Sequence, residues 1–158
     1  NYFNARSSGE KLDLHIDSWI PYKGKKTHIM QFVFLLEKST KKNGCTIVAK
    51  KSHKSGKFSN RKTKKIIPVT GNPGDLIIWD SRLWHGTLKN IDKTSRWAIV
   101  VTLSSWWVKQ AMDMPSGLPK TIYKKCSKVE KQLLGFCSIP PKNEFERINT
   151  KSNYSILK

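Results

Sequence analysis

The chain has 158 residues, of which 37% are hydrophobic and 26% are charged. This length suits a domain with its own core, and the composition excludes collagen-like and intrinsically disordered chains. No apolar run approaches the ~20 residues that a membrane-spanning helix requires. Three widely spaced cysteines without a C-x-x-C pair argue against a disulfide framework or a thiolate zinc site. We therefore expect a soluble, cytoplasmic protein with reduced cysteines.

Positive charge is concentrated in two parts of the chain. The 30 Lys and Arg exceed the 11 Asp and Glu by 19. Residues 38–67 hold 11 of the basic residues and no acidic one, and most of the remaining excess lies in residues 115–158. Charge alone would suggest a nucleic acid or another polyanion as partner. The segments with regular apolar patterns are close to neutral, so the charge does not identify the function.

Alternating apolar and polar residues predict the first strand, over residues 11–17. The apolar face of this strand comprises Leu12, Leu14 and Ile16. His15 and Asp17 fall on the other face, because side chains two residues apart in a strand point the same way. The strand therefore presents an imidazole and a carboxylate side by side.

A hairpin is predicted next. Residues 27–37 are almost wholly apolar, which is typical of a strand that is buried on both faces or lies in the middle of a sheet. The pair Asn43-Gly44 then predicts a turn with positive φ. Residues 45–49 have the composition of a strand, and we expect them to return alongside the first one.

The middle of the chain predicts a basic loop followed by further strands. Residues 50–65 are rich in Lys, lack periodicity and carry no acidic residue, so we expect an exposed loop. Short strands are predicted at residues 66–69, 76–79, 83–88 and 96–108. Many short strands separated by turns favour a mainly β fold, either a sandwich, a barrel or a double-stranded β-helix. We assign residues 1–114 to this core.

The C-terminal segment differs in composition from the core. Residues 115–158 are rich in Lys, Ser and Pro, and one short helix is predicted near residues 129–134, ended by Gly135. We expect this segment to be a short α/coil appendage that packs on the β core.

Three residues form a candidate metal site: His15, Asp17 and His85. His85 lies in a strand-like segment, where Gly86 allows a neighbouring backbone to approach closely. Two histidines and one carboxylate on one side of an ion form the facial triad of non-haem iron oxygenases, which leaves positions open for a cosubstrate and O₂. Zinc usually takes a more closed, tetrahedral set. The pattern therefore favours Fe(II).

Arg96 is the candidate for binding an anionic cosubstrate. It begins a predicted strand on which its same-face neighbours are small or apolar, so its guanidinium needs an anion to offset burial. A dicarboxylate would satisfy this need if its far carboxylate accepted two hydrogen bonds from Arg96 and its near end bound the iron. The alternative is a structural salt bridge to an acidic residue, of which the candidates are Asp75, Asp80 and Asp92.

The order of these motifs resembles a known family. In chain order they are His15-x-Asp17, Asn43-Gly44-Cys45-Thr46, Ser52-His53, Gly74-Asp75-Leu76, His85-Gly86-Thr87 and Arg96. Over about residues 10–115 this combination is similar to the phytanoyl-CoA dioxygenase-like branch of the Fe(II)/2-oxoglutarate oxygenases. The resemblance implies a double-stranded β-helix core of the jelly-roll or cupin-like kind.

The resemblance also implies roles for single residues. His15, Asp17 and His85 match the iron ligands and catalytic residues, and Arg96 matches the residue that binds a carboxylate of 2-oxoglutarate. Thr87 matches a hydroxyl position that assists at the same carboxylate. The implied cofactors are Fe(II), 2-oxoglutarate and O₂. Related halogenases lack the carboxylate that Asp17 supplies, so the resemblance favours hydroxylation.

The chain departs from the family pattern in two places. In the family the H-x-D motif lies much further along the chain, behind N-terminal helices and the first core strand. We therefore expect the core to be N-terminally incomplete here. Lys51 stands where relatives usually carry a small residue, so the loop at Ser52-His53 is expected to differ in conformation and charge.

These observations predict an Fe(II)- and 2-oxoglutarate-dependent dioxygenase that hydroxylates a small organic substrate. The basic loop at residues 50–65 would attract a substrate bearing a carboxylate, a phosphate, CoA or a carrier protein, although a solvated surface is the alternative. Two other functions stay open: an oxygenase that acts on nucleic acid, and a non-catalytic basic β domain that binds polyanions. No base-reading motif supports the nucleic-acid alternatives.

Three further residues, one tryptophan and two histidines, are candidates for the site. Trp19 closely follows Asp17, and it either lines the substrate pocket or packs against the core. His28 and His53 belong to no set with metal-ligand spacing, so we do not expect them to be ligands.

Overall fold

The computed structural model describes residues 2–6, 9–60, 63, 65–92 and 94–145. The chain divides into two compact units, one of residues 3–102 and one of residues 1–2 with 103–158. The boundary between the units falls within strand β8 (Ala98–Ser104). The functional division predicted at residue 114 stays a prediction.

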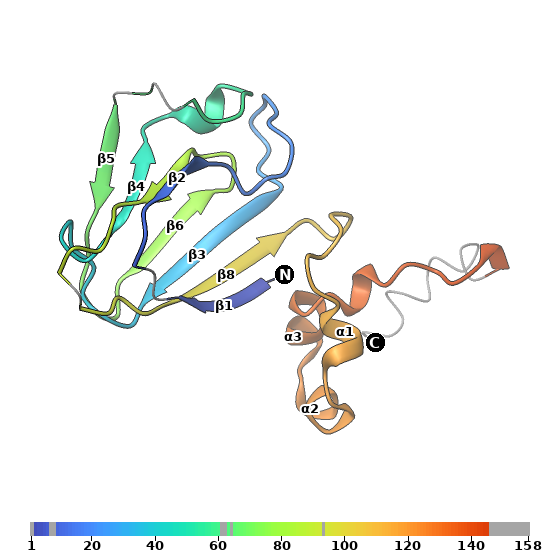
Figure 1. Ribbon diagram of the computed structural model, residues 1–158. Helices are drawn as coiled ribbons and strands as arrows, with labels where there is room; N and C mark the ends of the chain where they lie inside the picture. Colours follow the sequence, from blue (N-terminus) through green and yellow to red (C-terminus); the bar gives the residue numbers. More distant parts are fainter. Residues whose placement is uncertain (1, 7–8, 61–62, 64, 93, 146–158) are drawn as a thin grey trace. The chain divides into compact units, whose positions relative to one another are not determined.

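The described strands form two four-stranded sheets (Figure 1). The strand order is β1-β8-β3-β6 in the first sheet and β2-β7-β4-β5 in the second. The first sheet contains β1 (Tyr2–Arg6), β8, β3 (Ile29–Leu35) and β6 (Leu76–Asp80). The second contains β2 (Leu12–His15), β7 (His85–Thr87), β4 (Thr46–Ala49) and β5 (Ile66–Val69). The predicted mainly β fold is confirmed, and β1 is a strand that the sequence pattern did not predict.

Strand β3 lies in the middle of its sheet, as predicted, but only one of its faces is buried. Its buried positions alternate and comprise Ile29, Gln31, Val33 and Leu35. The inward face packs with Ala98 of β8 and with Ile77 and Trp79 of β6, which builds the apolar core. The opposite face is open, and its exposed apolar residues include Phe34, Leu36, Leu76, Ile78, Trp97 and Ile99. In the described residues, β3 is therefore buried on one face and not on both.

The predicted hairpin between β3 and β4 is wrong. Gly44 does adopt the expected positive φ, at 87°, and the side chain of Asn43 closes the turn on the backbone of Thr40 and Lys38. Both edges of β3 are already occupied, by β8 and β6, so β4 cannot pair with it. The chain instead crosses to the second sheet, where β4 pairs with β5 and β7.

Two predicted strands are shorter in the structure. The strand expected over residues 11–17 ends at His15, so Asp17 lies beyond it. The strand expected over 96–108 begins at Ala98. The backbone N–H of Trp97 donates to a carboxylate oxygen of Glu37, at 2.8 Å, and this side-chain partner replaces a ladder hydrogen bond. A pattern of apolar residues does not reveal such side-chain contacts, so it could not predict where this strand begins.

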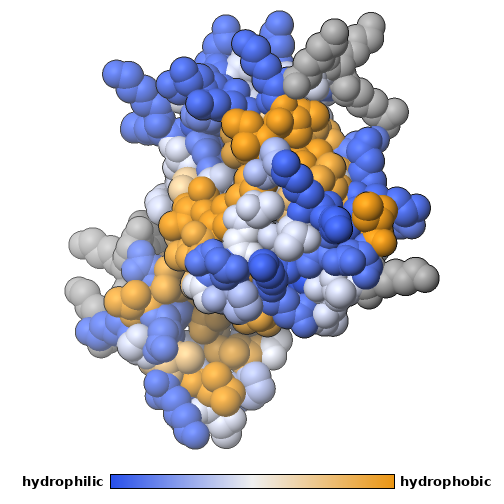
Figure 2. Space-filling model, turned by 90° about the vertical axis from the view of Figure 1, so that its left-hand side faces the viewer, coloured by the Kyte–Doolittle hydropathy of each residue, from blue (hydrophilic) through white to orange (hydrophobic). Residues whose placement is uncertain are grey.

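The basic loop is tethered to the second sheet. It contains a 3₁₀ turn at Ser52–Lys54, next to Lys51 with φ 65°. The Ser52 hydroxyl accepts the backbone N–H of Trp84, and the indole N–H of Trp84 donates to the carbonyl of Lys57. Figure 2, which views the molecule from the side where β5 lies in Figure 1, shows hydrophobic surface bordered by hydrophilic side chains.

The second unit contains short helices. They are α1 (Met114–Gly117), α2 (Lys120–Lys125), α3 (Lys128–Leu133) and the 3₁₀ turn η2 (Phe136–Ser138). The predicted helix corresponds to α3, which begins at a capping box formed by Ser127 and Glu130. The rings of Tyr123 and Phe136 pack at a tilt, with 4.7 Å between their centroids. No helix in the described ranges has the length and hydropathy that crossing a membrane would need.

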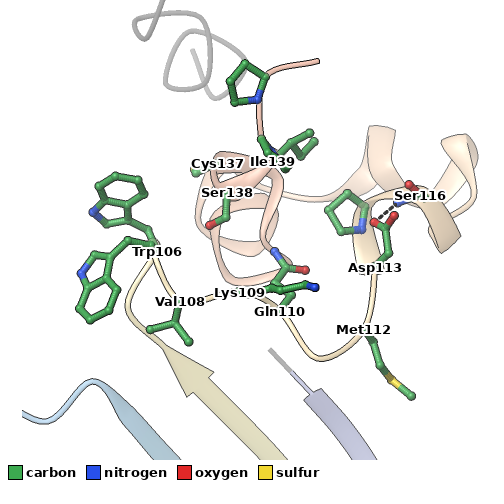
Figure 3. A pocket seen from close by; sticks show the side chains of 14 residues that line it. Trp106, Val108, Lys109, Gln110, Met112, Asp113, Ser116, Cys137, Ser138 and Ile139 are labelled. Carbon is green, nitrogen blue, oxygen red and sulfur yellow. Dashed lines mark hydrogen bonds between the residues drawn. The ribbon is translucent and has the colours of Figure 1, made fainter. Parts of the chain in front are cut away.

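A pocket of about 780 Å³ lies within the second unit (Figure 3). Residues 106–116 line one part of it and residues 137–141 another. Trp106, Met112 and Ile139 make much of this lining apolar. None of the residues predicted to bind metal or cosubstrate lines this pocket.

Candidate metal centre

The strand pairing of the second sheet brings the three predicted metal ligands together. β2 and β7 pair so that His15 and His85 are direct partners, and their ring centroids lie 4.3 Å apart. A Cβ at Gly86 would collide with the backbone oxygen of Leu12, so glycine permits this close pairing. Asp17 follows β2, and its backbone N–H donates to the carbonyl of Ser81 at 2.9 Å.

The carboxylate of Asp17 lies between the two imidazoles. Oδ1 is 3.4 Å from Nε2 of His15, and Oδ2 is 3.2 Å from Nε2 of His85. One ligand atom from each of the three residues lies within 4.8 Å of the others. The three side chains can therefore reach a common ion.

Both histidines are oriented by backbone carbonyls. Nδ1 of His15 lies 2.9 Å from the carbonyl oxygen of Asp13, and Nδ1 of His85 lies 2.9 Å from that of Leu83. Because a carbonyl only accepts, each Nδ1 carries a proton, which leaves Nε2 of each ring facing Asp17 as the atom available to a metal ion. A hydrogen bond at the second ring nitrogen is the usual way to orient a metal-binding histidine.

The pKa of Asp17 is governed by opposing effects. Burial raises it, but hydrogen bonds from His15 and His85, together with their charge, outweigh burial and hold the pKa well below its usual range. Asp17 is therefore a carboxylate, the form that binds metal ions.

A buried amide contacts the same carboxylate. Nε2 of Gln31 donates to Oδ2 of Asp17 at 2.9 Å, and Oε1 of Gln31 accepts from the hydroxyl of Thr102 at 2.7 Å. Neither Gln31 nor Thr102 was predicted as a site residue from the sequence. The only signal was that Gln31 is the one polar residue within the apolar run at residues 29–36.

Trp79 is a second interior residue whose role was not recognised. Its ring lies 5.1 Å from that of His85. Its indole Nε1, however, is buried and has no acceptor among the described residues. An indole N–H in such a place usually has a hydrogen-bond partner, so the barrel interior beside His85 suits a polar ligand.

The other predicted site residues are Arg96, Thr87 and Trp19. Arg96 is half-buried and precedes β8, and a Cβ at Gly44 would lie 3.4 Å from its Nε. The Thr87 hydroxyl accepts the backbone N–H of Leu12 at 3.1 Å. Trp19 is 76% exposed and has a φ of 58°. The roles assigned to Arg96, Thr87 and Trp19 stay predictions.

Comparison with known proteins identifies the family. The family model described as phytanoyl-CoA dioxygenase (PhyH) matches residues 1–98, which is more than half of the chain. The chain belongs to the phytanoyl-CoA dioxygenase family. The resemblance drawn from the motif order is thereby confirmed.

The relatives that match this chain are longer than the chain itself. Dioxygenase af480 of Aspergillus fumigatus is 26% identical over 141 residues, which cover 85% of this chain and 46% of the relative. The apo crystal structure of EctD from S. alaskensis matches 66% of this chain and 43% of its own, with a TM-score of 0.54 and 23% identity. HygX from Streptomyces hygroscopicus, with nickel, 2-oxoglutarate and hygromycin B bound, matches 63% of this chain and 52% of its own, with a TM-score of 0.52 and 15% identity.

These matches settle the fold of the phytanoyl-CoA dioxygenase family member. The two four-stranded sheets form the double-stranded β-helix that was predicted. The chain spans about half the length of the relatives that it matches.

Proposed function

We propose that this family member is an Fe(II)- and 2-oxoglutarate-dependent dioxygenase that hydroxylates a small organic substrate. The observation that carries the proposal is the gathering of ligand atoms from His15, Asp17 and His85 within 4.8 Å of one another. Two imidazoles and one carboxylate are the donor set of non-haem iron oxygenases and fit Fe(II). Two of its relatives support the same assignment: one is a dioxygenase, and the other has nickel and 2-oxoglutarate bound.

Polar groups along the interior of the first sheet support 2-oxoglutarate as the cosubstrate. Inward-facing residues of β8 lead from Thr102, which contacts Gln31 beside the metal ligands, through Val100 and Ala98 toward Arg96. Trp79 packs against this row and offers its buried indole N–H. A dicarboxylate between the triad and Arg96 would accept hydrogen bonds from the guanidinium and from this indole. We assign both residues to cosubstrate binding, with Thr87 as an accessory.

The protein's part in the reaction is binding and orientation. The chemistry that the cofactors would supply when bound is oxidative decarboxylation of 2-oxoglutarate by O₂, in which one oxygen atom enters succinate, CO₂ is released and the other oxygen atom is inserted into a substrate C–H bond. His15, Asp17 and His85 would hold the metal on one side, and Arg96 would fix the orientation of the cosubstrate. The apolar row on β8 and β6 would limit the access of water.

The basic loop supports an anionic substrate. Lys51, Lys54 and Lys57 are exposed and form no ion pair with any carboxylate in the described ranges. The hydroxyl of Ser59 in this loop donates to the carbonyl of Leu14, the neighbour of His15. The positive charge is therefore held near the metal ligands, where it would favour a substrate bearing a carboxylate, a phosphate or CoA. Trp19, in the segment after Asp17, is assigned to the edge of the proposed substrate site.

Anaerobic addition of Fe(II) and 2-oxoglutarate tests the proposed function. We expect a weak visible metal-to-ligand charge-transfer band. In Trp79→Phe, the 2-oxoglutarate concentration that gives half of the maximal band intensity should rise about tenfold, because this variant loses one hydrogen bond to a charged group. Trp84→Phe is the control, because its indole N–H donates to the Lys57 carbonyl instead. Absence of a band from the wild-type protein would contradict the function, and an unchanged titration would contradict the role of Trp79.

The alternative function, a non-catalytic domain that binds polyanions, is favoured only by the net charge of +19. We expect tripolyphosphate to bind the protein at low ionic strength. The double variant Lys54→Glu, Lys57→Glu should lower the affinity for tripolyphosphate by about tenfold, and this difference should disappear near 1 M salt. The matched control is Lys120→Glu, Lys124→Glu in the second unit. Duplex DNA should bind no more tightly than ~10⁻⁶ M at physiological salt. Tighter DNA binding that depends on Lys54 and Lys57 would favour the alternative.

A further inference from the structure

Gln31 is the polar member of an otherwise apolar row. It is 3% exposed, and its buried neighbours on the same face of β3 are Ile29 and Val33. Burying an amide is unfavourable unless its donors and its acceptor are hydrogen-bonded. An apolar residue would extend the core at this position, so the amide calls for a reason other than packing.

The contacts of Gln31 fix the direction of its amide. The carboxylate of Asp17 can only accept hydrogen bonds, so the NH₂ group of Gln31 faces it, at 2.9 Å. The amide oxygen then faces Thr102, whose hydroxyl donates at 2.7 Å. Rotating the amide by 180° would place two acceptors against each other at Asp17. Thr102 therefore keeps the donor end of Gln31 directed at the metal-binding carboxylate.

The three residues come from elements of different rigidity. β3 and β8, which carry Gln31 and Thr102, are the two central strands of the first sheet. Asp17 lies beyond the end of β2, where its backbone N–H has the carbonyl of Ser81 as partner. Gln31 thus connects a side chain on an irregular segment to the most constrained strands of the barrel.

We propose that Gln31, held by Thr102, is a positioning residue that sets the orientation of the Asp17 carboxylate toward Nε2 of His15 and His85. The inference rests on the proposed function, because it concerns the ligand set of that site. Gln31 occupies one lone pair of Oδ2 and so limits how the carboxylate can rotate. Groups that hydrogen-bond to metal ligands typically change metal affinity by 10- to 100-fold when they are removed.

Cobalt(II) provides the test, since its visible absorption reports both affinity and coordination. In the anaerobic 158-residue protein we expect Gln31→Leu to weaken Co(II) binding by about tenfold or more and to alter the band shape. Thr102→Val should act in the same direction with a smaller effect, and Thr102→Ser, which keeps the hydroxyl, should restore wild-type binding. Asn43→Leu is the control, because it removes a buried amide whose contacts are to Thr40 and Lys38.

Each outcome bears on one hypothesis. Wild-type protein that takes up no Co(II) would overturn the proposed function together with the ligand set. Wild-type binding with unchanged affinity and spectrum in Gln31→Leu would overturn the positioning role alone. If Gln31→Leu does not fold, the comparison of Thr102→Val with Thr102→Ser decides, and equal Co(II) affinities in these two variants would overturn the role of the hydrogen-bonded pair.

Discussion

Replacing His85 by Ala is expected to lower the affinity for Fe(II) or Co(II) by more than about a hundredfold. His85 is buried, and its Nε2 is one of three candidate ligand atoms within 4.8 Å of one another. Loss of a direct ligand should exceed the 10- to 100-fold effect that is typical of groups behind the ligands. Anaerobic metal titration, followed by absorption or calorimetry, measures the change.

Two variants separate ligation from folding in this experiment. Asp17→Asn keeps the size of the side chain but removes the charge that binds a cation, and it should lose metal affinity to a similar extent. His53→Ala removes a histidine from the 3₁₀ turn of the basic loop and should bind metal like the wild type. Metal binding by His85→Ala within threefold of the wild type, about 0.65 kcal/mol, would exclude His85 as a ligand.

Replacing Arg82 by Met is expected to destabilise the protein by about 3–5 kcal/mol, because it leaves Asp80 as a buried charge without its cation. The two side chains are 5% and 13% exposed, and Nη2 of Arg82 lies 2.6 Å from Oδ2 of Asp80. Arg82 also lies over the Tyr22 ring and donates to the carbonyl of Gly24. The loop between Asp17 and β3 should therefore loosen as well. Urea unfolding monitored by circular dichroism measures the loss.

The ion pair also predicts how stability depends on pH. Burial raises the pKa of Asp80, but hydrogen bonds from Arg82 and Thr27 outweigh it and leave the folded-state pKa below the ordinary value. A depressed carboxyl pKa adds stability above the unfolded-state value of about 3.9, and this stability is lost as pH falls through the folded-state pKa. Wild-type protein should lose this contribution below about pH 4. Arg82→Met should lack it, since burial of Asp80 is no longer offset.

A surface ion pair provides the control for Arg82. Lys89 and Glu10 lie 3.6 Å apart and are 60% and 82% exposed. Lys89→Met should leave the urea midpoint nearly unchanged, because exposed pairs are screened by water and salt. If Arg82→Met unfolds at the same urea concentration as Lys89→Met, the buried pair does not stabilise the fold.

The sequence alone was sufficient for the fold class, the family and the candidate metal ligands. Periodicity in a strand is local, so the alternation around His15 and Asp17 placed both side chains on one face. The order of motifs from His15 to Arg96 then identified the family, which the match to residues 1–98 confirms.

Only the tertiary structure decided how the strands pair and what surrounds the carboxylate. The Asn43-Gly44 turn predicted a hairpin, but β8 and β6 occupy both edges of β3, and pairing between distant strands is not encoded in a local turn. In the same way, Gln31 stood out only as one polar residue in an apolar run. Its contacts with Asp17 and Thr102 join residues 14 and 71 positions away, and hydrogen bonds over such separations exist only once the sheets have assembled.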